Sequence, residues 1–249
     1  MTPAGATRDG VTVVVPHRSA SAALARLLPA IEGWRVLVVD DSDAGVALDV
    51  PTIRLGGGRG FASAANAGLA AVRTASAILL NDDALPLGDC LDRLAARGGL
   101  CGPVIEGPSG IESSGFFVRS WGRVVQRIDR PTADRPVDAL SGACLHLPAA
   151  ARFDPRFPHG FEDVELCRRI GGAWLLAGAR CFHEGGATLS RRSPQATRHA
   201  VTGQALLFPE GWRTGVVAGL HALQVVREGG SPQRFSAIAA GIREAGRRR

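Results

Sequence analysis

The first part of the chain alternates between short apolar runs and segments whose apolar residues recur at helical spacing. Residues 10–18 (GVTVVVPHR) and 35–45 (RVLVVDDSDAG) are rich in β-branched side chains and end in polar ones, a pattern typical of buried strands. Residues 19–31 (SASAALARLLPAI), which lie between them, repeat apolar side chains with the period of a helix. This stretch therefore predicts a strand, a helix and a second strand.

The same alternation continues to about residue 106. It predicts strands at 50–55, 77–84 and 100–106, and helices at 61–75 and 88–98. Strands that alternate with helices favour an open, mostly parallel α/β sheet. In such sheets ligands bind beyond the carboxyl ends of the strands, and three of these ends read PHR, DDSD and NDDA. We therefore expect a binding crevice there.

After residue 110 the pattern changes. Residues 113–129 predict two short strands around a turn, and residues 137–148 predict a further strand. A helix is expected to begin near Phe161, and residues 173–186 predict a strand that ends at His183. The rest, 201–249, reads as helices. We expect a disordered tail at 1–9, a catalytic α/β domain at 10–200 and a basic helical extension at 201–249.

One stripe in the helical extension has two interpretations. Within residues 215–226 (GVVAGLHALQVV), a helix places Val216, Leu220, Leu223 and either Gln224 or Val226 on one side. In the first interpretation this stripe packs the helix onto the rest of the protein. In the second, the arginine-rich segment docks on an anionic membrane surface that carries a lipid-linked acceptor.

Charge is distributed unevenly along the 249 residues. The chain has 29 basic and 23 acidic residues, and every basic one is arginine. Residues 1–190 carry 19 Arg against 20 acids, whereas residues 191–249 carry 10 Arg against 3 acids. The positive charge therefore belongs to the C-terminal quarter and indicates something about a partner of that segment. Because these arginines lack interleaved aromatic side chains, we do not expect a nucleic-acid partner.

Several classes of protein are excluded by what the sequence lacks. Without Lys or Tyr there is no Walker A loop, no pyridoxal Schiff base and no Tyr–Lys oxidoreductase pair. The glycine-rich residues 54–61 (RLGGGRGF) fail the dinucleotide pattern, since Phe61 or Ser63 stands where the third glycine belongs. Five scattered cysteines without a C-x-x-C pair predict buried free thiols: Cys90, Cys101, Cys144, Cys167 and Cys181.

The location predicted from the sequence is cytoplasmic. No stretch approaches the roughly 18 uninterrupted apolar residues of a membrane span. The first ten residues (MTPAGATRDG) also lack the apolar centre of a signal peptide. Docking of the basic extension would add peripheral attachment to the inner face of the cell membrane.

The acidic pair Asp82 and Asp83 allows two interpretations. Both follow an apolar run, so they could simply cap a strand exit, with Pro86 delaying the helix that follows. Adjacent carboxylates repel each other, however, and hard divalent cations prefer oxygen ligands and phosphate oxygens. At a strand end of this sheet type, a metal–phosphate site is the second interpretation.

Two further candidates lie in the second half of the chain. Glu162 and Asp163 (GFEDVELCRR) fall in the first turn of the expected helix, where acids offset the macrodipole, but an aspartate there could also act as a general base. His183 (CFHEGG) ends a strand and is either a satisfied polar group or a metal ligand.

Taken in order, these motifs resemble a known family. The segments VTVVVPHR, VLVVDDSDAG, GRGFASAANAGLAAV, ILLNDDA, SGACLHL, GFEDVELCRR and CFHEGG are similar to family-2 glycosyltransferases with the GT-A fold. They are most similar to the bacterial rhamnosyltransferase-like branch, and the resemblance runs from about residue 10 to 190. It implies a GT-A, Rossmann-like central sheet with flanking helices.

The resemblance also implies which residues hold the nucleotide sugar. Asp40 or Asp41 would pair with the base, Asp82 would touch the ribose, and the other residues would line the donor and acceptor pocket. The full set is Pro16, His17, Arg18, Asp40, Asp41, Gly60, Asn66, Asp82, Gly142 and Ala143. The residues PHR differ from the family, which more often has an aromatic triplet there. The identity of the nucleotide base in the donor therefore stays open. Asn81 replaces the first residue of the usual aspartate triad.

The remaining roles implied by the resemblance concern metal and catalysis. Asp83 would hold a divalent cation, Mn²⁺ or Mg²⁺, on the pyrophosphate, and His183 would be a further ligand. Asp163 would deprotonate the acceptor hydroxyl, with Glu162 beside it. The implied function is a metal-dependent, inverting glycosyltransferase that moves a hexosyl or deoxyhexosyl group.

The implied donor is a UDP- or dTDP-linked sugar, and the implied acceptor is a glycan or lipid-linked hydroxyl in polysaccharide or glycolipid synthesis. The main alternative is a catalytically silent accessory protein that binds nucleotide sugars. A sugar nucleotidyltransferase is a third option, but it would normally show a Gly-rich N-terminal loop with a basic signature and Lys, and the sequence has neither.

Overall fold

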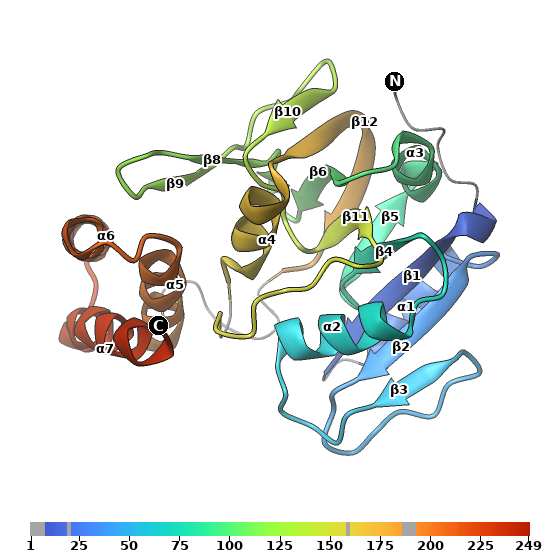
Figure 1. Cartoon of the computed structure of the whole chain (residues 1–249), viewed down its shortest axis with the longest axis horizontal. Coiled ribbons are helices and arrows are strands. Elements are labelled where there is room, and N and C mark those ends of the chain that lie inside the picture. Colours follow the sequence, from blue (N-terminus) through green and yellow to red (C-terminus); the bar gives the residue numbers. More distant parts are fainter. Residues whose placement is uncertain (1–7, 19–20, 158–159, 186–192) are drawn as a thin grey trace.

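The protein is built on one large mixed sheet, described by a computed structural model for residues 8–18, 21–157, 160–185 and 193–249 (Figure 1). In this part of the chain the strand order is β10-β12-β6-β11-β4-β1-β2-β3, with β5 paired to β12 and β7 to β6. The strands are β1 Val11–His17, β2 Arg35–Asp40, β3 Thr52–Arg54, β4 Ser76–Leu80, β5 Ala84–Leu87, β6 Cys101–Gly107, β7 Gly110–Ser113, β10 Arg135–Val137, β11 Cys144–Pro148 and β12 Ala173–His183.

One half of the sheet is the parallel α/β unit that the sequence predicts. Strands β3, β2, β1 and β4 run parallel to one another, and all seven residues of β1 are buried. Both faces are covered, which explains the uninterrupted β-branched runs. The covering helices are α1 Ser21–Ala30, α2 Phe61–Ala71, α3 Cys90–Arg97 and α4 Glu162–Ile170.

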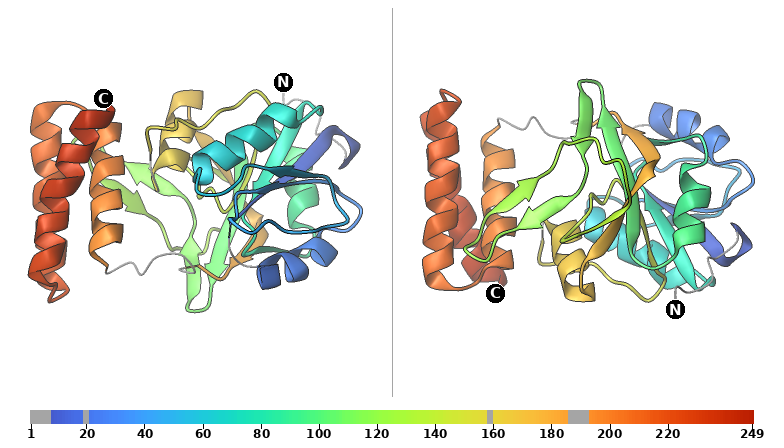
Figure 2. Two further views of the ribbon diagram at one scale, coloured as in Figure 1. Left: turned by 90° about the horizontal axis from the view of Figure 1, so that it is seen from below. Right: turned by 90° about the horizontal axis from the view of Figure 1, so that it is seen from above.

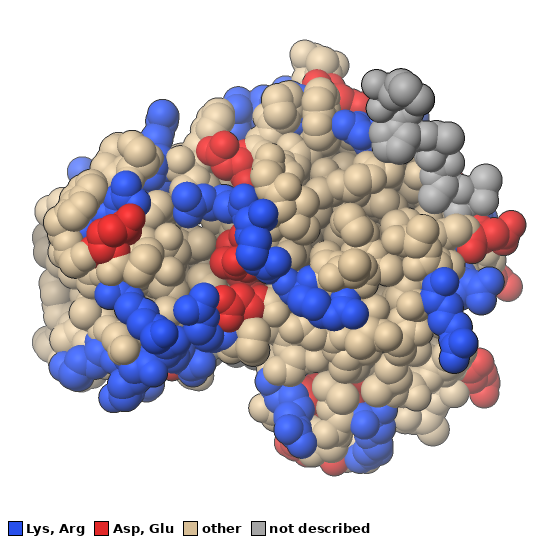
Figure 3. All heavy atoms as spheres, viewed as in Figure 1, with Lys and Arg blue, Asp and Glu red and all other residues tan. Residues whose placement is uncertain are grey.

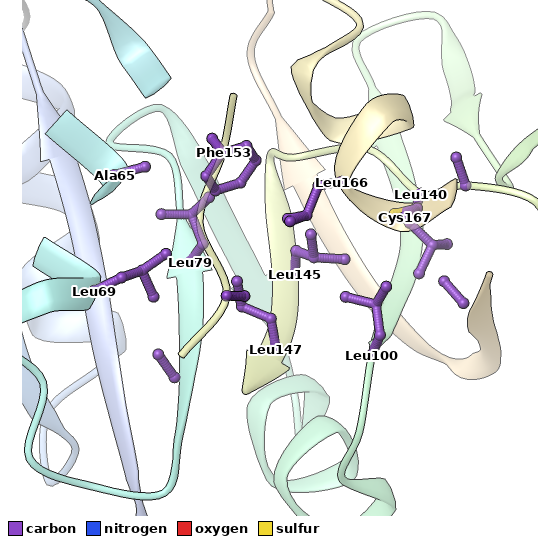
Figure 4. Close-up of a cluster of buried hydrophobic side chains, with 14 of the residues drawn as sticks. Ala65, Leu69, Leu79, Leu100, Leu140, Leu145, Leu147, Phe153, Leu166 and Cys167 are labelled. Carbon is purple, nitrogen blue, oxygen red and sulfur yellow. The ribbon is translucent and has the colours of Figure 1, made fainter. Parts of the chain in front are cut away.

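Two apolar layers lie on opposite faces of the sheet. Helices α2 and α4 close one face over a cluster that includes Leu69, Leu79 and Leu166 (Figure 4). Helices α1 and α3 close the other face over a cluster that includes Leu27 and Leu94. The predicted α/β fold class is therefore confirmed.

Helix α2 approaches the sheet closely because its sequence is made of small residues. A Cβ added to Gly68 would lie 2.3 Å from Val14 Cγ1 and 2.9 Å from Val39 Cγ2. No side chain fits into that space without displacing strand residues. This close packing fixes the height of the α2 N-terminus above the carboxyl ends of β1 and β2.

The other half of the sheet contains two short strands that the sequence did not predict, β5 and β7, and one predicted strand, β11, that runs antiparallel. Pro86 does not delay a helix, because it lies inside β5, where it pairs antiparallel opposite Cys181 of β12. Strand β11 runs antiparallel between β4 and β6, which makes the sheet mixed. The predicted hairpin at 113–129 is confirmed as β8 Phe116–Val118 and β9 Val124–Gln126.

The C-terminal residues form a three-helix bundle of α5 Pro194–Leu207, α6 Gly211–Arg227 and α7 Pro232–Arg248. Val201, Val217, Val225 and Ile238 make its separate core. Figure 2 shows α5 between the other two helices and the rest of the molecule. The side-chain amide of Gln204 on α5 donates to the carbonyl oxygen of Gly122 in the β8–β9 turn at 2.5 Å.

The stripe expected to face inward on α6 lies on the wrong side of the helix. The buried residues of α6 are Val217 and Val225, whereas Leu223 and Val226 are 59% and 65% exposed. Both sides of α6 are apolar, so the periodicity alone did not distinguish them. The first interpretation is therefore wrong for Leu223 and Val226, whereas Val216 and Leu220 are half-buried and α6 does pack in the bundle.

The cysteines, the helices and the N-terminal residues also bear on what the sequence predicts. The five cysteines are buried and free, as predicted. Within the described ranges, no helix has the length and apolar character needed to cross a bilayer. Of the expected tail, residues 1–7 lie outside the described residues, while Arg8–Gly10 form a short 3₁₀ turn and Arg8 pairs with Asp92 at 2.7 Å.

Candidate active site

Polar side chains converge at the carboxyl ends of the parallel strands, where the sequence predicts a crevice. The register of β1 and β2 sets His17 opposite Asp40. His17 Nδ1 lies 2.7 Å from Asp82 Oδ2, which joins the end of β1 to the segment after β4. Pro16 is buried beside His17 in β1, whereas the Arg18 side chain is half-exposed. The structure therefore brings the first and fourth strand ends into contact.

Asp40 is buried and fully hydrogen-bonded. Ser42 donates to Asp40 Oδ1 from its amide at 2.9 Å and from its hydroxyl at 2.6 Å, and the Val46 amide donates to Oδ2 at 2.9 Å. Burial alone would raise the pKa of Asp40, but the bonds from Ser42 and Val46 outweigh it and lower that pKa. Asp40 therefore stabilises the turn after β2 as a carboxylate.

Asp41 fastens the glycine-rich segment to the site. The amides of Arg59 and Gly60 donate to its two oxygens at 2.9 Å each, and Arg18 approaches at 3.3 Å. Gly60 has a φ of 85° at the N-terminus of α2, a conformation that favours glycine. Asp41 thus brings Gly60 and Arg18 together beside the end of β2, and their contact with a sugar nucleotide stays a prediction.

Asn66 has its amide group occupied within the protein. Its Nδ2 donates to the carbonyl oxygen of Phe153 at 2.8 Å, and its Oδ1 accepts from the Phe153 amide at 2.7 Å. This pair of bonds ties α2 to the segment before α4. Contact of Asn66 with a sugar nucleotide stays a prediction.

Asp83 and His183 form a partly buried pair beside the same strand ends. His183 Nε2 lies 3.2 Å from Asp83 Oδ1, and the two side chains are 17% and 15% exposed. On its other nitrogen, Nδ1, His183 lies 3.1 Å from Glu112 Oε2. Burial alone would lower the pKa of His183, but its bonds to Asp83 and Glu112 raise that pKa to about 10.

This pair has the chemistry of a partial metal site. A carboxylate oxygen and an imidazole nitrogen on facing side chains are both metal donors, and a carboxylate on the far imidazole nitrogen is the usual support for a ligating histidine. Among residues 8–18, 21–157, 160–185 and 193–249, no group of three or more His, Cys, Asp or Glu could hold a metal ion by itself. A cation here would need ligands from a bound molecule, such as phosphate oxygens.

Asp163 lies at the start of α4 and is anchored to the loop before β11. Gly142 donates its amide to Asp163 Oδ2 at 2.9 Å, and the Val164 amide donates to Oδ1 at 2.8 Å. Burial raises the pKa of Asp163, while these two amides act in the opposite direction. A Cβ on Gly142 would lie 3.4 Å from Asp163 Cβ, so a side chain there would crowd the carboxylate.

Glu162 differs from its neighbour in its hydrogen bonding. Its Oε2 is buried, and no described residue hydrogen-bonds to it. Burial, followed by repulsion from Asp163, raises the pKa of Glu162 to about 8. We therefore assign the proton of the pair to Glu162 near neutral pH and the charge to Asp163.

Backbone strain accompanies this pair. Phe161, which precedes α4, has a φ of 69°, and it is the one non-glycine residue with positive φ in the described part of the chain. Such strained conformations concentrate at functional sites. The strained turn delivers Glu162 and Asp163 to the site side of α4.

A backbone hydrogen bond connects the segment that carries Asp83 with the loop that holds Asp163. The Asn81 amide donates to the carbonyl oxygen of Ala143 at 2.9 Å, and Ala143 follows Gly142. Asn81 Oδ1 is buried, and no hydrogen-bond partner for it lies among the described residues. Asp82 and Asp83 therefore lie on one side of this link and Asp163 on the other.

One residue of the site was missed by the sequence reading. Glu112 lies in β7, a four-residue strand that pairs antiparallel with β6. The letters GIES carry no motif, and the approach of Glu112 to His183 depends on the pairing of both strands with β6. Only the register of β6 could have indicated it.

Some known proteins are similar to this chain in sequence. No family model matches the chain. Two curated proteins of Mycobacterium tuberculosis, from strains CDC 1551 / Oshkosh and ATCC 25618 / H37Rv, are each named pre-mycofactocin glycosyltransferase. Each is 30% identical to the chain in an alignment 208 residues long, and the match covers 73% of the chain and 42% of the relative. The chain thus spans about two fifths of the length of the curated relatives it matches.

Solved structures give the fold. The crystal structure of GalNAc-T7 with UDP, GalNAc and Mn²⁺ matches with a TM-score of 0.63 at 14% identity, over 94% of this chain and 53% of that one. Staphylococcus aureus TarS 1–349 in complex with UDP-GlcNAc matches with a TM-score of 0.58 at 14% identity, over 94% and 81%. The chain has the GT-A glycosyltransferase fold, as its motifs predict.

Proposed function

We propose that this chain is a family-2 glycosyltransferase that transfers a sugar from a nucleoside-diphosphate sugar to an acceptor hydroxyl. The observation that carries the proposal is the anchored Asp163, linked through Gly142, Ala143 and Asn81 to the acidic strand end of β4. A base on one side and a diphosphate site on the other are what glycosyl transfer requires. The ordered motifs support a place near the rhamnosyltransferase-like branch.

The donor side of the proposed site is formed by the strand ends and the glycine-rich segment. Pro16 to Arg18 would line the base pocket, with His17 oriented by Asp82. Asp82, 19% exposed, would also accept from the ribose hydroxyls. Asp41 contributes by holding Gly60 and Arg18 in place. Curated relatives named as glycosyltransferases, and a neighbour crystallised with UDP-GlcNAc, support this donor class.

A divalent cation fits the Asp83–His183 pair. Asp83 Oδ1 and His183 Nε2 would be the protein ligands, and diphosphate oxygens would supply others, consistent with a neighbour crystallised with Mn²⁺. When bound, the cation neutralises charge on the leaving diphosphate. Glu112 keeps the His183 ring oriented with Nε2 toward Asp83.

Asp163 is the proposed general base. It would take the proton of the acceptor hydroxyl as the acceptor oxygen bonds to the anomeric carbon and the bond from that carbon to the phosphate oxygen breaks. The nucleoside diphosphate leaves with the electron pair, and a single base suits inversion by in-line displacement. Its raised pKa brings Asp163 closer to neutral pH, where a general base is most effective.

Acceptor and domain roles are further parts of the proposal. We assign catalysis to residues 10–200 and propose a glycan or lipid-linked acceptor in polysaccharide or glycolipid synthesis. The acceptor would enter on the side of α4, because Asp163 lies at the N-terminus of that helix. A UDP- or dTDP-linked hexose or deoxyhexose is the expected donor.

A donor screen tests the function. The chain is incubated with Mn²⁺ and UDP- or dTDP-linked sugars, and the nucleotide products are separated. Nucleoside diphosphate is the expected product, even if water is the only acceptor. Pyrophosphate would indicate a sugar nucleotidyltransferase instead. Donor binding without nucleoside diphosphate release, over a panel of glycan and lipid acceptors, would indicate the silent accessory protein.

A further inference from the structure

The outer face of α6 and α7 concentrates exposed apolar side chains. Ten large hydrophobic residues are exposed in the described chain, and four of them lie on these two helices. They are Trp212, Leu223 and Val226 of α6, 60%, 59% and 65% exposed, and Phe235 of α7, 41% exposed. Single exposed apolar residues are ordinary, but a group of this kind marks a contact surface.

The apolar residues of α6 form one stripe opposite the bundle core. Trp212, Leu223 and Val226 are separated by eleven and three residues, which is about three turns and then one further turn. The core residues Val217 and Val225 lie on the other side of the helix. Gly215 and Gly219 fall on the stripe, and an added Cβ on either would meet nothing within 4 Å. No described part of the chain covers this side of α6.

The three-helix bundle as a whole carries unbalanced positive charge. All three glutamates of the bundle are ion-paired within it: Glu210 with Arg213 at 2.8 Å, Glu228 with Arg234 at 2.7 Å, and Glu244 with Arg198 at 2.7 Å. Of the ten C-terminal arginines, Arg191 and Arg192 lie outside the described residues, which leaves eight against three glutamates.

Three of these arginines point to the outer face. Arg227, Arg243 and Arg247 are exposed, and none has a carboxylate within ion-pair distance among the described residues. Arg227 ends α6 beside Val226, and Arg243 lies two turns beyond Phe235 on α7. Figure 3 shows arginines gathered over the C-terminal helices.

We propose that the outer face of α6 and α7, defined by Trp212, Leu223, Val226, Phe235, Arg227, Arg243 and Arg247, docks on an anionic lipid bilayer. Exposed Trp, Phe and aliphatic side chains enter the interfacial region, and arginines bind lipid phosphates. Charge selects this partner, because two copies of the face would set arginine against arginine. Helix α5 lies between this face and the rest of the molecule (Figure 2).

Vesicle co-sedimentation of the full chain tests the proposal, independently of any transferase activity. The vesicles contain equimolar phosphatidylcholine and phosphatidylglycerol, or phosphatidylcholine alone. We expect binding to the anionic vesicles that weakens with added salt, and at least about tenfold weaker binding to neutral ones. Two variants remove the face: Trp212→Ser with Leu223→Ser and Val226→Ser, and Arg243→Gln with Arg247→Gln. Each should lower the partition coefficient about tenfold or more.

Matched controls lie elsewhere on the surface. Ile128→Ser removes a 68% exposed apolar residue, and Arg35→Gln with Arg73→Gln removes two exposed arginines from the sheet part of the chain. Both controls should bind like the unchanged chain, and circular dichroism should show all variants folded. Wild-type binding by the face variants, or no binding by the unchanged chain, would overturn the proposal. Light-scattering evidence of a dimer abolished by the apolar variant would overturn it in favour of a second copy.

Discussion

At the residue scale, the site depends on carboxylates that differ in what bonds to them. Asp163 accepts hydrogen bonds from two backbone amides, while one buried oxygen of Glu162 has no partner among the residues that the structure describes. Neighbouring carboxyls in different environments divide into a charged and a neutral member. This division makes Asp163 the base and Glu162 its neutral neighbour.

The Glu162 carboxyl should make stability depend on pH. Its pKa rises from 4.5 to about 8 on folding, so between these values the unfolded chain loses a proton that the folded chain keeps. Folding therefore loses stability as pH increases from 4.5 to about 8. Glu162→Gln removes this loss, and its Tm should exceed that of the unchanged chain by more at about pH 8 than at about pH 5. An equal difference at both pH values would contradict the assignment.

The contact of Glu112 with His183 should control metal affinity. Glu112→Gln weakens the support on Nδ1 and should lower Mn²⁺ affinity about 10- to 100-fold in calorimetric titrations with UDP present. Glu184→Gln is the control, because Glu184 follows His183 directly but pairs with Arg26 at 2.5 Å on the surface. If the two variants bind Mn²⁺ equally well, Glu112 does not orient a metal ligand.

The strand-end residues could be predicted from the sequence because they end apolar runs whose architecture is known. His17, Asp40 and Asp82 meet at the edge where parallel strands terminate. The sequence did not indicate the hydrogen-bond partners of these side chains. Asp40 accepts hydrogen bonds within the turn after β2, and Asn66 bonds to the backbone of Phe153. Hydrogen-bond partners that lie far apart in the chain are set by packing, which no local pattern encodes.

At the element scale, strand type limited what the sequence could predict. Parallel strands buried on both faces gave clear β-branched runs, whereas β5 is four residues long and contains Pro86. Helix α6 was recognised as a helix, but its buried side was assigned wrongly because Val217 and Leu223 lie on opposite apolar sides. Periodicity finds a helix, and only tertiary contacts choose between two apolar faces.

Two glycines in helices should respond oppositely to alanine. Gly68→Ala in α2 places a Cβ 2.3 Å from Val14 Cγ1 and should destabilise the protein by about 1–3 kcal/mol through overpacking. Gly215→Ala in α6 meets nothing within 4 Å and should stabilise it by about 0.5–1 kcal/mol. Urea denaturation measures both. A neutral Gly68→Ala would mean that α2 does not pack so closely on β1.

At the scale of the whole molecule, the chain divides its chemistry between two parts. The sheet carries the acidic strand ends, and the bundle carries the excess of arginine. The uneven charge was visible in the sequence, but the outward direction of the α6 stripe appeared only once the bundle was assembled. The two proposals therefore concern separate surfaces and can fail separately.

Similar structures support the fold of this chain, whereas its activity needs separate evidence. GT-A structures at 14% identity support the fold of the whole chain, while the curated relatives extend well beyond it. Transfer of their named activity to this chain therefore depends on the site itself. Asp163 is the residue whose replacement separates catalysis from donor binding.

The role of Asp163 as the general base is tested by measuring nucleoside diphosphate release and donor affinity for three proteins: the unchanged chain, Asp163→Asn and Glu165→Gln. Glu165 is the matched control, on the same helix but paired with Arg169 at 2.7 Å. We expect Asp163→Asn to lower kcat about 10²- to 10⁴-fold with donor affinity retained, while Glu165→Gln stays active. Full turnover by Asp163→Asn would contradict the account, because its proposed base would then be unnecessary.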